Sequence, residues 1–352
     1  MANDPKRYTL TRRQMLSLMG VVGASALFPS TSFAEESSYE SADNPPNPVG
    51  MLTNEEAFTA TNARSAGPSW KDSASGDGNK AFYNGDGSIY LDPAYKVIDV
   101  SEHNGTIDWN SVKAAGVDAA IIRLGFGCDR ADYQLRNNIN GCASLGIPYG
   151  LYLYSYAYDA NFAGDEANFT ANLIEEYGCK PTLPIFYDLE KWTWTGHTPP
   201  STPSAYRSIV NRYCSVMKSR GYGNVRVYSY RSYLNNELRH DDIWSRAAWG
   251  AEYGSSTISF DNPYYEGCLA WQYTSTGSIS GISGNVDVNA FPPFYKLAFG
   301  DVNTKTDHYQ DIWWLAENSI SEGFPDGTYR GLNSVARQDM AAFLHRIKQI
   351  MG

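Results

Sequence analysis

Two acidic residues at the end of an apolar run are spaced so that they can share one site. The run covers residues 183–190, and its carboxylates are Asp188 and Glu190. In an extended strand, side chains two residues apart point to the same face, with Cα atoms roughly 6.6 Å apart. Repulsion between two such carboxylates, together with burial, raises the pKa of at least one of them. A carboxyl group that keeps its proton near neutral pH can act as a general acid.

The elements that must position these acids follow a regular alternation from Lys96 onward. Short runs rich in β-branched and aromatic residues are separated by stretches with helical spacing. The predicted strands are 97–100, 119–125, 149–156, 183–189, 225–230, 247–251 and 269–273, and the predicted helices are 109–115, 134–145, 164–177 and 204–220. This pattern predicts an α/β fold with a parallel sheet, and its length favours a TIM-like (β/α) barrel over an open doubly wound sheet.

In a barrel of this kind the active site lies at the C-terminal ends of the strands. Asp99 ends the first predicted strand, and Asp287 follows the last one. Converging carboxylates without a Cys/His set either bind a hard cation or catalyse acid chemistry on a glycosidic bond. Aromatic residues at neighbouring strand ends favour a sugar ligand. The aromatic candidates for substrate binding are Tyr154, Tyr228, Trp249 and Trp271, and Arg123 is a candidate counter-charge.

Several segments resemble, in the same order, the motifs of glycoside hydrolase family 25, the lysozymes that cleave peptidoglycan. They are VIDVSEHNGTIDW at 97–109, AIIR at 120–123, GLYLYSYA at 150–157, DLE at 188–190, WGAEY at 249–253, AWQY at 270–273 and GISGNVD at 281–287. The resemblance covers roughly residues 96–293. It implies an irregular barrel of eight strands and about five helices, N-acetylmuramidase activity on peptidoglycan glycan strands, and neither metal nor other cofactor.

Carried over by position, the resemblance also implies roles for the acids. Glu190 matches the general acid that protonates the leaving oxygen, and Asp188 matches its partner. That partner is either a nucleophile or a stabiliser of an intermediate formed by the substrate's own N-acetyl group. Asp99 and Asp287 match acids that shape the floor of the cleft.

Two other functions remain open. A chitinase-like hydrolase also presents alternating acids on a strand, but Pro184 and Phe186 stand where its longer acidic motif would continue. A catalytically silent wall-binding protein could use the same barrel, although binding alone does not require a protonatable pair of carboxyl groups.

The N-terminal residues 1–34 have the pattern of an export signal. Basic residues precede an apolar run at 16–28, and Ser32-Phe33-Ala34 resembles a signal-peptidase site. The pair Arg12-Arg13 favours a twin-arginine signal, with Sec export as the alternative. The apolar run is short for a bilayer span, so we expect no integral membrane span in the mature chain, and an extracellular or cell-wall-associated location.

The remaining chain divides by composition. Residues 35–95, rich in Ser, Asn, Asp, Gly and Pro, are predicted to form a linker or N-terminal extension, and 96–294 the barrel. Residues 298–352 contain two predicted amphipathic helices and resemble a single S-layer-homology-like repeat, a module type that attaches to cell-wall polymers. A helix pair with a purely structural role is the competing interpretation.

Composition narrows the choice of partners. The formal net charge of −10 over 352 residues argues against nucleic acid, because phosphate binding requires a basic surface. The five cysteines include neither a CxxC pair nor a metal-binding spacing, and an odd number cannot all pair within one chain. Their apolar neighbours favour buried thiols at least as much as disulfides.

Overall fold

The computed structural model describes a part of the chain that contains the whole predicted catalytic region except for short gaps. The described residues are 44–48, 67–74, 79–255, 257–258, 270–292, 299, 301–302, 306–317, 320–324 and 328–351. The predicted export signal at 1–34 lies outside them. Of the two compact units of the chain, Met1–Tyr39 and Glu40–Gly352, all the structure reported below belongs to the second. No helix within the described residues is long and apolar enough to cross a membrane.

Eight strands of the described residues close into a barrel. They are β3 (Ile89–Val100), β4 (Ala119–Phe126), β6 (Tyr149–Tyr154), β7 (Ile185–Asp188), β8 (Val225–Tyr230), β9 (Ala247–Ala251), β10 (Ala270–Gly277) and β11 (Val286–Phe291). From β3 to β10 the neighbouring strands are parallel, while β11 is antiparallel to both β10 and β3 and closes the ring. The predicted irregular α/β barrel is therefore confirmed. The antiparallel strand β11, absent from the predicted strands, is the source of the irregularity.

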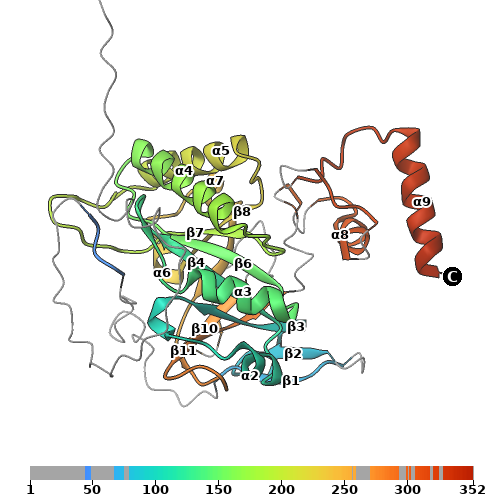
Figure 1. Cartoon of the computed structure of the whole chain (residues 1–352), viewed down its shortest axis with the longest axis horizontal. Coiled ribbons are helices and arrows are strands. Elements are labelled where there is room, and N and C mark those ends of the chain that lie inside the picture. Colours follow the sequence, from blue (N-terminus) through green and yellow to red (C-terminus); the bar gives the residue numbers. More distant parts are fainter. Residues whose placement is uncertain are drawn as a thin grey trace, which may run out of the picture. The chain divides into compact units, whose positions relative to one another are not determined.

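Helices pack around the outside of the strands (Figure 1). They are α2 (Trp109–Ala114), α3 (Leu135–Leu145), α4 (Ala160–Tyr177), α5 (Pro203–Ser219), α6 (Arg231–Asn235) and α7 (Asp241–Trp244). The sequence determines both ends of α4. At its start, Asp159 accepts a hydrogen bond from the Phe162 N–H at 2.8 Å, and at its end Gly178 takes the left-handed conformation with φ 64°. The first four were predicted. The other two span five and four residues, too few to show a helical period.

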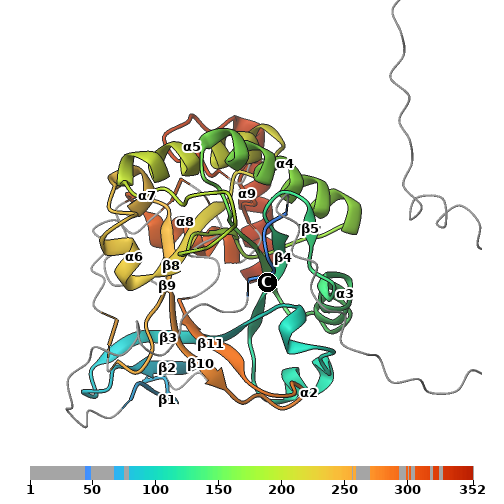
Figure 2. The ribbon, with the colours of Figure 1, turned by 90° about the vertical axis from the view of Figure 1, so that its left-hand side faces the viewer.

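Part of the predicted linker is a sheet. Strand β2 (Lys80–Tyr83) pairs in antiparallel fashion with β1 (Ser69–Asp72) on one side and with the first half of β3 on the other. Figure 2 shows these strands beside β10 and β11. Phe82 packs against Trp70, Tyr90 and Trp271. The barrel strand β3 thus begins seven residues before the predicted boundary at 96, and the strands β1 and β2 extend the fold. A two-residue strand β5 (Arg130–Ala131) pairs with the end of β4.

Alternation along β7 separates two environments. Phe186 points into the barrel, where its ring lies 5.0 Å from that of Trp249 and 6.2 Å from that of Phe291. Tyr187 points outward and stacks on Tyr213 of α5, with 3.7 Å between the ring centroids. Because Asp188 follows Tyr187, the strand period turns it inward, above the aromatic side chains that fill the barrel.

The C-terminal residues form a small core of their own. Phe299, Val302 and Ile312 are buried together, and the helices are α8 (Tyr309–Glu317) and α9 (Arg337–Met351). The two predicted helices of this region are therefore present. Its likeness to an S-layer-homology repeat stays a prediction.

Four cysteines have free thiols: Cys142, Cys179 and Cys214 are buried and Cys128 is half-buried. Cys268 lies outside the described residues. For the three buried residues the interpretation as small apolar side chains agrees with the structure.

Candidate active site

The register of the parallel strands β6, β7, β8 and β9 places one side chain from each strand at the same height along the barrel axis. Asp188 of β7 lies opposite Tyr154 of β6 on one side and Tyr228 of β8 on the other. Tyr228 in turn lies opposite Trp249 of β9. These four residues stand at or near the C-terminal ends of their strands, so the barrel itself places the acid among three aromatic side chains.

The antiparallel strand β11 adds a second acid pair. Asp287 lies directly opposite Asp99 of β3. The sequence placed Asp287 after the last strand, whereas the structure places it on β11. Since β11 runs against its neighbours, its N-terminal end lies at the rim where the parallel strands end. Asp287 therefore reaches the same rim from the opposite chain direction.

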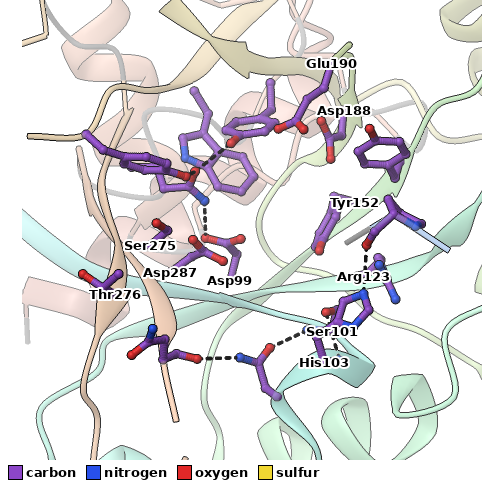
Figure 3. Close-up of a pocket in the computed structure, with 18 residues that line it drawn as sticks. Asp99, Ser101, His103, Arg123, Tyr152, Asp188, Glu190, Ser275, Thr276 and Asp287 are labelled. Atoms are coloured by element: carbon purple, nitrogen blue, oxygen red, sulfur yellow. Dashed lines mark hydrogen bonds between the residues drawn. The ribbon is translucent and has the colours of Figure 1, made fainter. Parts of the chain in front are cut away.

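A cavity of about 450 Å³ opens at this rim (Figure 3). Seven of the eight predicted site residues line it, namely Asp99, Asp188, Glu190, Asp287, Tyr154, Tyr228 and Trp249. The other lining residues are Pro48, Ser101, His103, Asn104, Arg123, Tyr152, Tyr253, Gln272, Ser275, Thr276 and Asn285. Figure 3 shows Asp188 and Glu190 together on one wall and Asp99 and Asp287 together below them.

Trp271 is the exception among the predicted residues. Its side chain is 0% exposed, packs against Phe82 and Tyr90, and donates a hydrogen bond from Nε1 to the Glu252 carbonyl at 2.9 Å. The next residue on β10, Gln272, faces the cavity instead. The prediction that Trp271 contacts substrate is corrected accordingly, because strand alternation allows only one of the two neighbours to face the site.

Asp99 is fixed by two amide side chains. Gln272 Nε2 and Asn289 Nδ2 each donate to its Oδ2 at 2.8 Å, and Asn289 Oδ1 accepts from Trp249 Nε1 at 2.8 Å. Burial raises the pKa of Asp99 to about 6, and the two amide hydrogen bonds act against that rise. The bonds hold the carboxylate at the floor of the cavity.

Asp188 is a buried acid with incomplete hydrogen bonding. It is 3% exposed, and its Oδ1 has no hydrogen-bond partner among the described residues. Burial raises the pKa of Asp188 well above its ordinary value, the charges of Glu190 and Asp99 raise it further, and the Arg123 guanidinium opposes the rise.

Glu190 is 8% exposed and stands one residue beyond Leu189, just past the end of β7. Burial raises the pKa of Glu190 to about 7, with hydrogen bonding from Tyr228 acting in the other direction and the Asp99 charge adding to the rise. A carboxyl group with this pKa is protonated in a large share of molecules at neutral pH. Glu190 and Asp188 are thus two buried carboxyl groups with raised pKa in the same cavity.

The segment after β7 is held by its neighbours on both sides. The Ser155 N–H donates to the Asp188 carbonyl and the Leu189 N–H donates to the Tyr228 carbonyl, each at 3.0 Å. The Tyr154 hydroxyl donates to the Lys191 carbonyl at 3.3 Å. These contacts fix the backbone on either side of Glu190, so its position depends on β6 and β8 as well as on β7.

Three residues of the site, Tyr253, Gln272 and Asn289, have a role that sequence reasoning did not assign. Tyr228 and Tyr253 both direct their hydroxyls to Gln272 Oε1, at 2.7 and 2.5 Å, and Gln272 and Asn289 bind Asp99. Asn289 stands two residues after Asp287, so the two side chains share one face if this segment is a strand. This signal can be used only once β11 is recognised as a strand. For Gln272 the signal is its polarity within an apolar strand, since a buried amide needs hydrogen-bond partners.

A cation site was the other chemistry open to clustered carboxylates. Within the described part of the chain, no group of three or more His, Cys, Asp or Glu side chains is arranged to hold a metal ion. The four cavity acids instead form two pairs. At the floor, Asp99 accepts from two amide side chains, and burial raises the pKa of all four carboxyl groups. This arrangement suits proton transfer to a bound oxygen.

Comparisons with known proteins match the barrel region of the chain to one enzyme family. The model of Glycosyl hydrolases family 25 matches residues 98–282. The autolytic lysozyme of Clostridium acetobutylicum is 27% identical over 198 residues, covering 56% of this chain and 55% of that protein. Lysozyme M1 of Streptomyces globisporus is 27% identical over 205 residues, covering 55% of this chain and 66% of that protein. The chain thus spans between about half and two thirds of the length of these relatives.

A solved structure adds to this picture. The modular autolysin LytC from Streptococcus pneumoniae, determined in complex with a synthetic peptidoglycan ligand, superposes with a TM-score of 0.59 and 40% sequence identity. The match covers 64% of this chain and 52% of that chain.

Proposed function

The chain belongs to glycosyl hydrolases family 25, and from that premise we propose that it is a lysozyme that cleaves the β-1,4 bond between N-acetylmuramic acid and N-acetylglucosamine in peptidoglycan. The names of the relatives and the peptidoglycan ligand of the structural relative support the substrate class. The observation that supports the chemistry is the pair Asp188 and Glu190, buried together in a cavity whose floor holds two more carboxyl groups.

Glu190 is the general acid in this proposal. Its raised pKa of about 7 keeps a proton available near neutral pH. That proton passes to the glycosidic oxygen as the bond to the sugar C1 breaks, and the oxygen leaves as a hydroxyl group. A water molecule then adds its hydroxyl to C1 and returns its other proton to Glu190.

Asp188 stabilises the positive charge that develops at the reacting sugar. It does so either by bonding to C1 as a nucleophile or by steadying the ring that forms when the substrate's N-acetyl oxygen attacks C1. A glycan whose muramic acid lacks the N-acetyl group separates the two mechanisms. Cleavage of that glycan at a comparable rate requires direct attack by Asp188, whereas loss of cleavage requires the N-acetyl group.

Asp99 and Asp287 shape the floor of the cavity without touching the leaving group. Asp99, held by Gln272 and Asn289, lies beneath the wall pair, and its charge contributes to the raised pKa of Asp188 and of Glu190. Tyr154, Tyr228 and Trp249 supply the apolar and hydroxyl surfaces against which a sugar ring packs.

The test is digestion of purified peptidoglycan followed by mass analysis of the fragments. Cleavage as proposed leaves N-acetylmuramic acid at the reducing end of every fragment. N-acetylglucosamine at the reducing end, or cleavage of N-acetylglucosamine polymers at a similar rate, contradicts the proposal and supports a chitinase-like hydrolase. Binding to peptidoglycan with no cleavage supports a catalytically silent wall-binding protein instead.

The proposal extends to the location of the protein. The basic start and apolar run of residues 1–34 support export by a twin-arginine or Sec signal, with the product outside the cell or on the wall. The helices of residues 298–352 support attachment to a cell-wall polymer in the manner of an S-layer-homology repeat. Sedimentation with isolated cell walls, compared between the full chain and a chain ending at residue 294, tests the attachment. Equal sedimentation of the two chains contradicts it.

A further inference from the structure

A short segment upstream of the barrel lies against one end of the catalytic cavity. Residues 44–48, which have the sequence Asn-Pro-Pro-Asn-Pro and are called the strap, precede the barrel strand β3 by about forty positions in the chain. Pro48 nevertheless lines the same cavity as Asp188 and Glu190. The strap lies outside the family match at residues 98–282.

Main-chain carbonyls hold the strap to the barrel. The Tyr156 hydroxyl donates to the Pro46 carbonyl at 2.7 Å, and His103 Nε2 donates to the Pro48 carbonyl at 2.8 Å. Pro45 packs so closely on Gly127 that a Cβ at that glycine would lie 2.9 Å from its Cγ. The barrel therefore has donors and a side-chain-free surface at the places where the strap lies.

The side chain of Asn47 makes a two-sided contact. Its Oδ1 accepts from Arg123 Nη2 at 3.3 Å, and its Nδ2 donates to Glu102 Oε1. A carboxamide that accepts on one side and donates on the other presents the same pair of groups as the acetamido substituent of an N-acetylated sugar. Asn47 is itself exposed, so the contact is made at the mouth of the site.

The two groups that receive Asn47 are fixed by the barrel. Arg123 Nε donates to Asp132 Oδ2 at 2.7 Å, and Glu102 Oε2 accepts from the Tyr133 N–H at 2.8 Å. The Glu102 N–H also donates to Asp132 Oδ2, at 2.9 Å. A donor and an acceptor are thus held in place by contacts that do not involve the strap, which is the property of a preformed binding site.

The position of this contact matters for a chain-like ligand. In Figure 3, Arg123 and His103 lie on one side of the four acids, and Ser275 and Thr276 lie on the other. A glycan that crosses the acids must extend toward both sides. The strap stands at the Arg123 side.

We propose that the strap occupies a subsite for one N-acetylated sugar at the Arg123 end of the cleft, with Asn47 in place of the acetamido group, and thereby limits the length of glycan that the cleft binds. This inference rests on the proposed function for the choice of ligand. It assigns Glu102 and Arg123 as the acceptor and donor of the covered subsite.

Titration calorimetry with N-acetylglucosamine oligomers tests the proposal. All proteins contain Glu190→Gln, so that the oligomers stay intact whatever the activity of the site. The first variant replaces the strap by Pro45→Gly, Pro46→Ser, Asn47→Gly and Pro48→Ser together. We expect it to bind the hexamer about tenfold more tightly than the parent and to bind the trimer equally, because only the longer ligand reaches the uncovered subsite.

The second variant, Asn47→Ala, removes the carboxamide and leaves the carbonyl contacts of the strap. We expect a gain of about threefold for the hexamer and none for the trimer. Asn161→Ala, at an exposed asparagine of α4, is the matched control and should change neither affinity. Thermal unfolding of every variant checks that the barrel is intact.

Equal hexamer affinities in parent and both strap variants, or hexamer binding too weak to detect in all of them, overturn the proposal. So does a change of the same size for trimer and hexamer. These outcomes differ from failure of the proposed function, which appears as absence of peptidoglycan cleavage by the protein that retains Glu190 while the length-dependent gain in binding persists.

Discussion

Two buried glutamates of this barrel have similar proton affinities and different surroundings. Burial raises the pKa of Glu190 to about 7, and burial raises the pKa of Glu166 to about 7 as well. Glu190 lines the catalytic cavity. Glu166 lies on α4, on the outer side of β7, and is not among the residues that line that cavity.

The surroundings of Glu166 are those of a structural group. Its Oε2 accepts from the Tyr187 hydroxyl at 2.5 Å and from Ser155 Oγ at 2.9 Å, and its Oε1 accepts from the Tyr156 N–H at 2.7 Å. Three donors from β7 and from the segment that follows β6 thus converge on one carboxylate. It fixes the outer side of the strand whose inner side bears Asp188.

The comparison shows that a raised pKa alone does not identify a catalytic acid. Both glutamates have one, and what separates them is access to a cavity that can hold a substrate. Glu190 combines a retained proton with that access, whereas the hydrogen bonds of Glu166 are all used within the fold. The consequences of mutation should therefore differ in kind at the two positions.

The largest expected effect is on activity. Glu190→Gln should lower the release of reducing ends from peptidoglycan by about a thousandfold or more, since loss of a general acid removes a factor of 10² to 10⁴ and Gln cannot donate the proton. Glu166→Gln should keep activity within about tenfold. Glu176→Gln, at an exposed position on α4, is the control and should match the parent. A larger loss at Glu166 than at Glu190 would reverse the assignment.

The next effect is on stability, and it should be larger for substitution of Glu166 than for substitution of Glu190. Glu166→Ala leaves the Tyr187 hydroxyl and the Tyr156 N–H without their acceptor and removes one of the two acceptors of Ser155 Oγ. We expect it to lower the free energy of unfolding by about 3 kcal/mol. Urea unfolding of Glu166→Ala and Glu190→Gln at pH 7 provides the measurement. A Glu166→Ala barrel as stable as the parent would show that the three donors do not depend on this carboxylate.

The dependence of stability on pH sharpens the contrast. The folded pKa of Glu190 lies above its ordinary value of 4.5. Below about pH 4.5 the carboxyl group is protonated in both the folded and the unfolded chain, so it does not affect stability. Between about pH 4.5 and 7 the unfolded chain loses this proton more readily, so the free energy of unfolding falls as pH rises. Glu190→Gln removes this loss of stability, so at pH 8 its free energy of unfolding should exceed that of the parent by up to about 3 kcal/mol, while the two should converge at pH 4. A constant difference across this range would contradict the raised pKa.

The smallest effect concerns one donor of the Glu166 group. Ser155→Ala removes one hydrogen bond to the buried carboxylate and also the Oγ that accepts from the Ala157 N–H at 3.1 Å, and it should destabilise the barrel by about 2 kcal/mol. Activity on peptidoglycan should stay within about twofold of the parent, because Ser155 lies on the outer side of the strand end. A drop in activity without a drop in stability would instead connect this network to the chemistry.

Much of the barrel could be predicted because its parallel strands are short apolar runs between glycine-terminated helices. The strand β8 has the predicted bounds, and Asp188 and Glu190 stand at the predicted strand end. The closing strand β11 has only six residues and no helix before it, so the βα pattern did not reveal it. The roles of Asn289 and the position of Asp287 on a strand were missed for the same reason.

Other parts of the site depend on contacts between distant segments. Periodicity cannot decide which of Trp271 and Gln272 faces the cavity, because both faces of β10 are buried at that point. The strap looks like a linker in the sequence, since its prolines and asparagines show no regular period. Its contacts with Glu102, Arg123 and Tyr156 arise only from the tertiary fold.

The most direct test of the central claim is a carbon-13 NMR titration of the glutamate carboxyl groups, with and without an N-acetylglucosamine hexamer. We expect two carboxyl resonances that titrate near pH 7, one lost in Glu190→Gln and the other in Glu166→Gln. Addition of the hexamer should shift the titration of the Glu190 resonance and leave that of Glu166 unchanged. A Glu190 resonance that titrates near its ordinary value of 4.5, or a hexamer-induced shift confined to Glu166, would contradict the account.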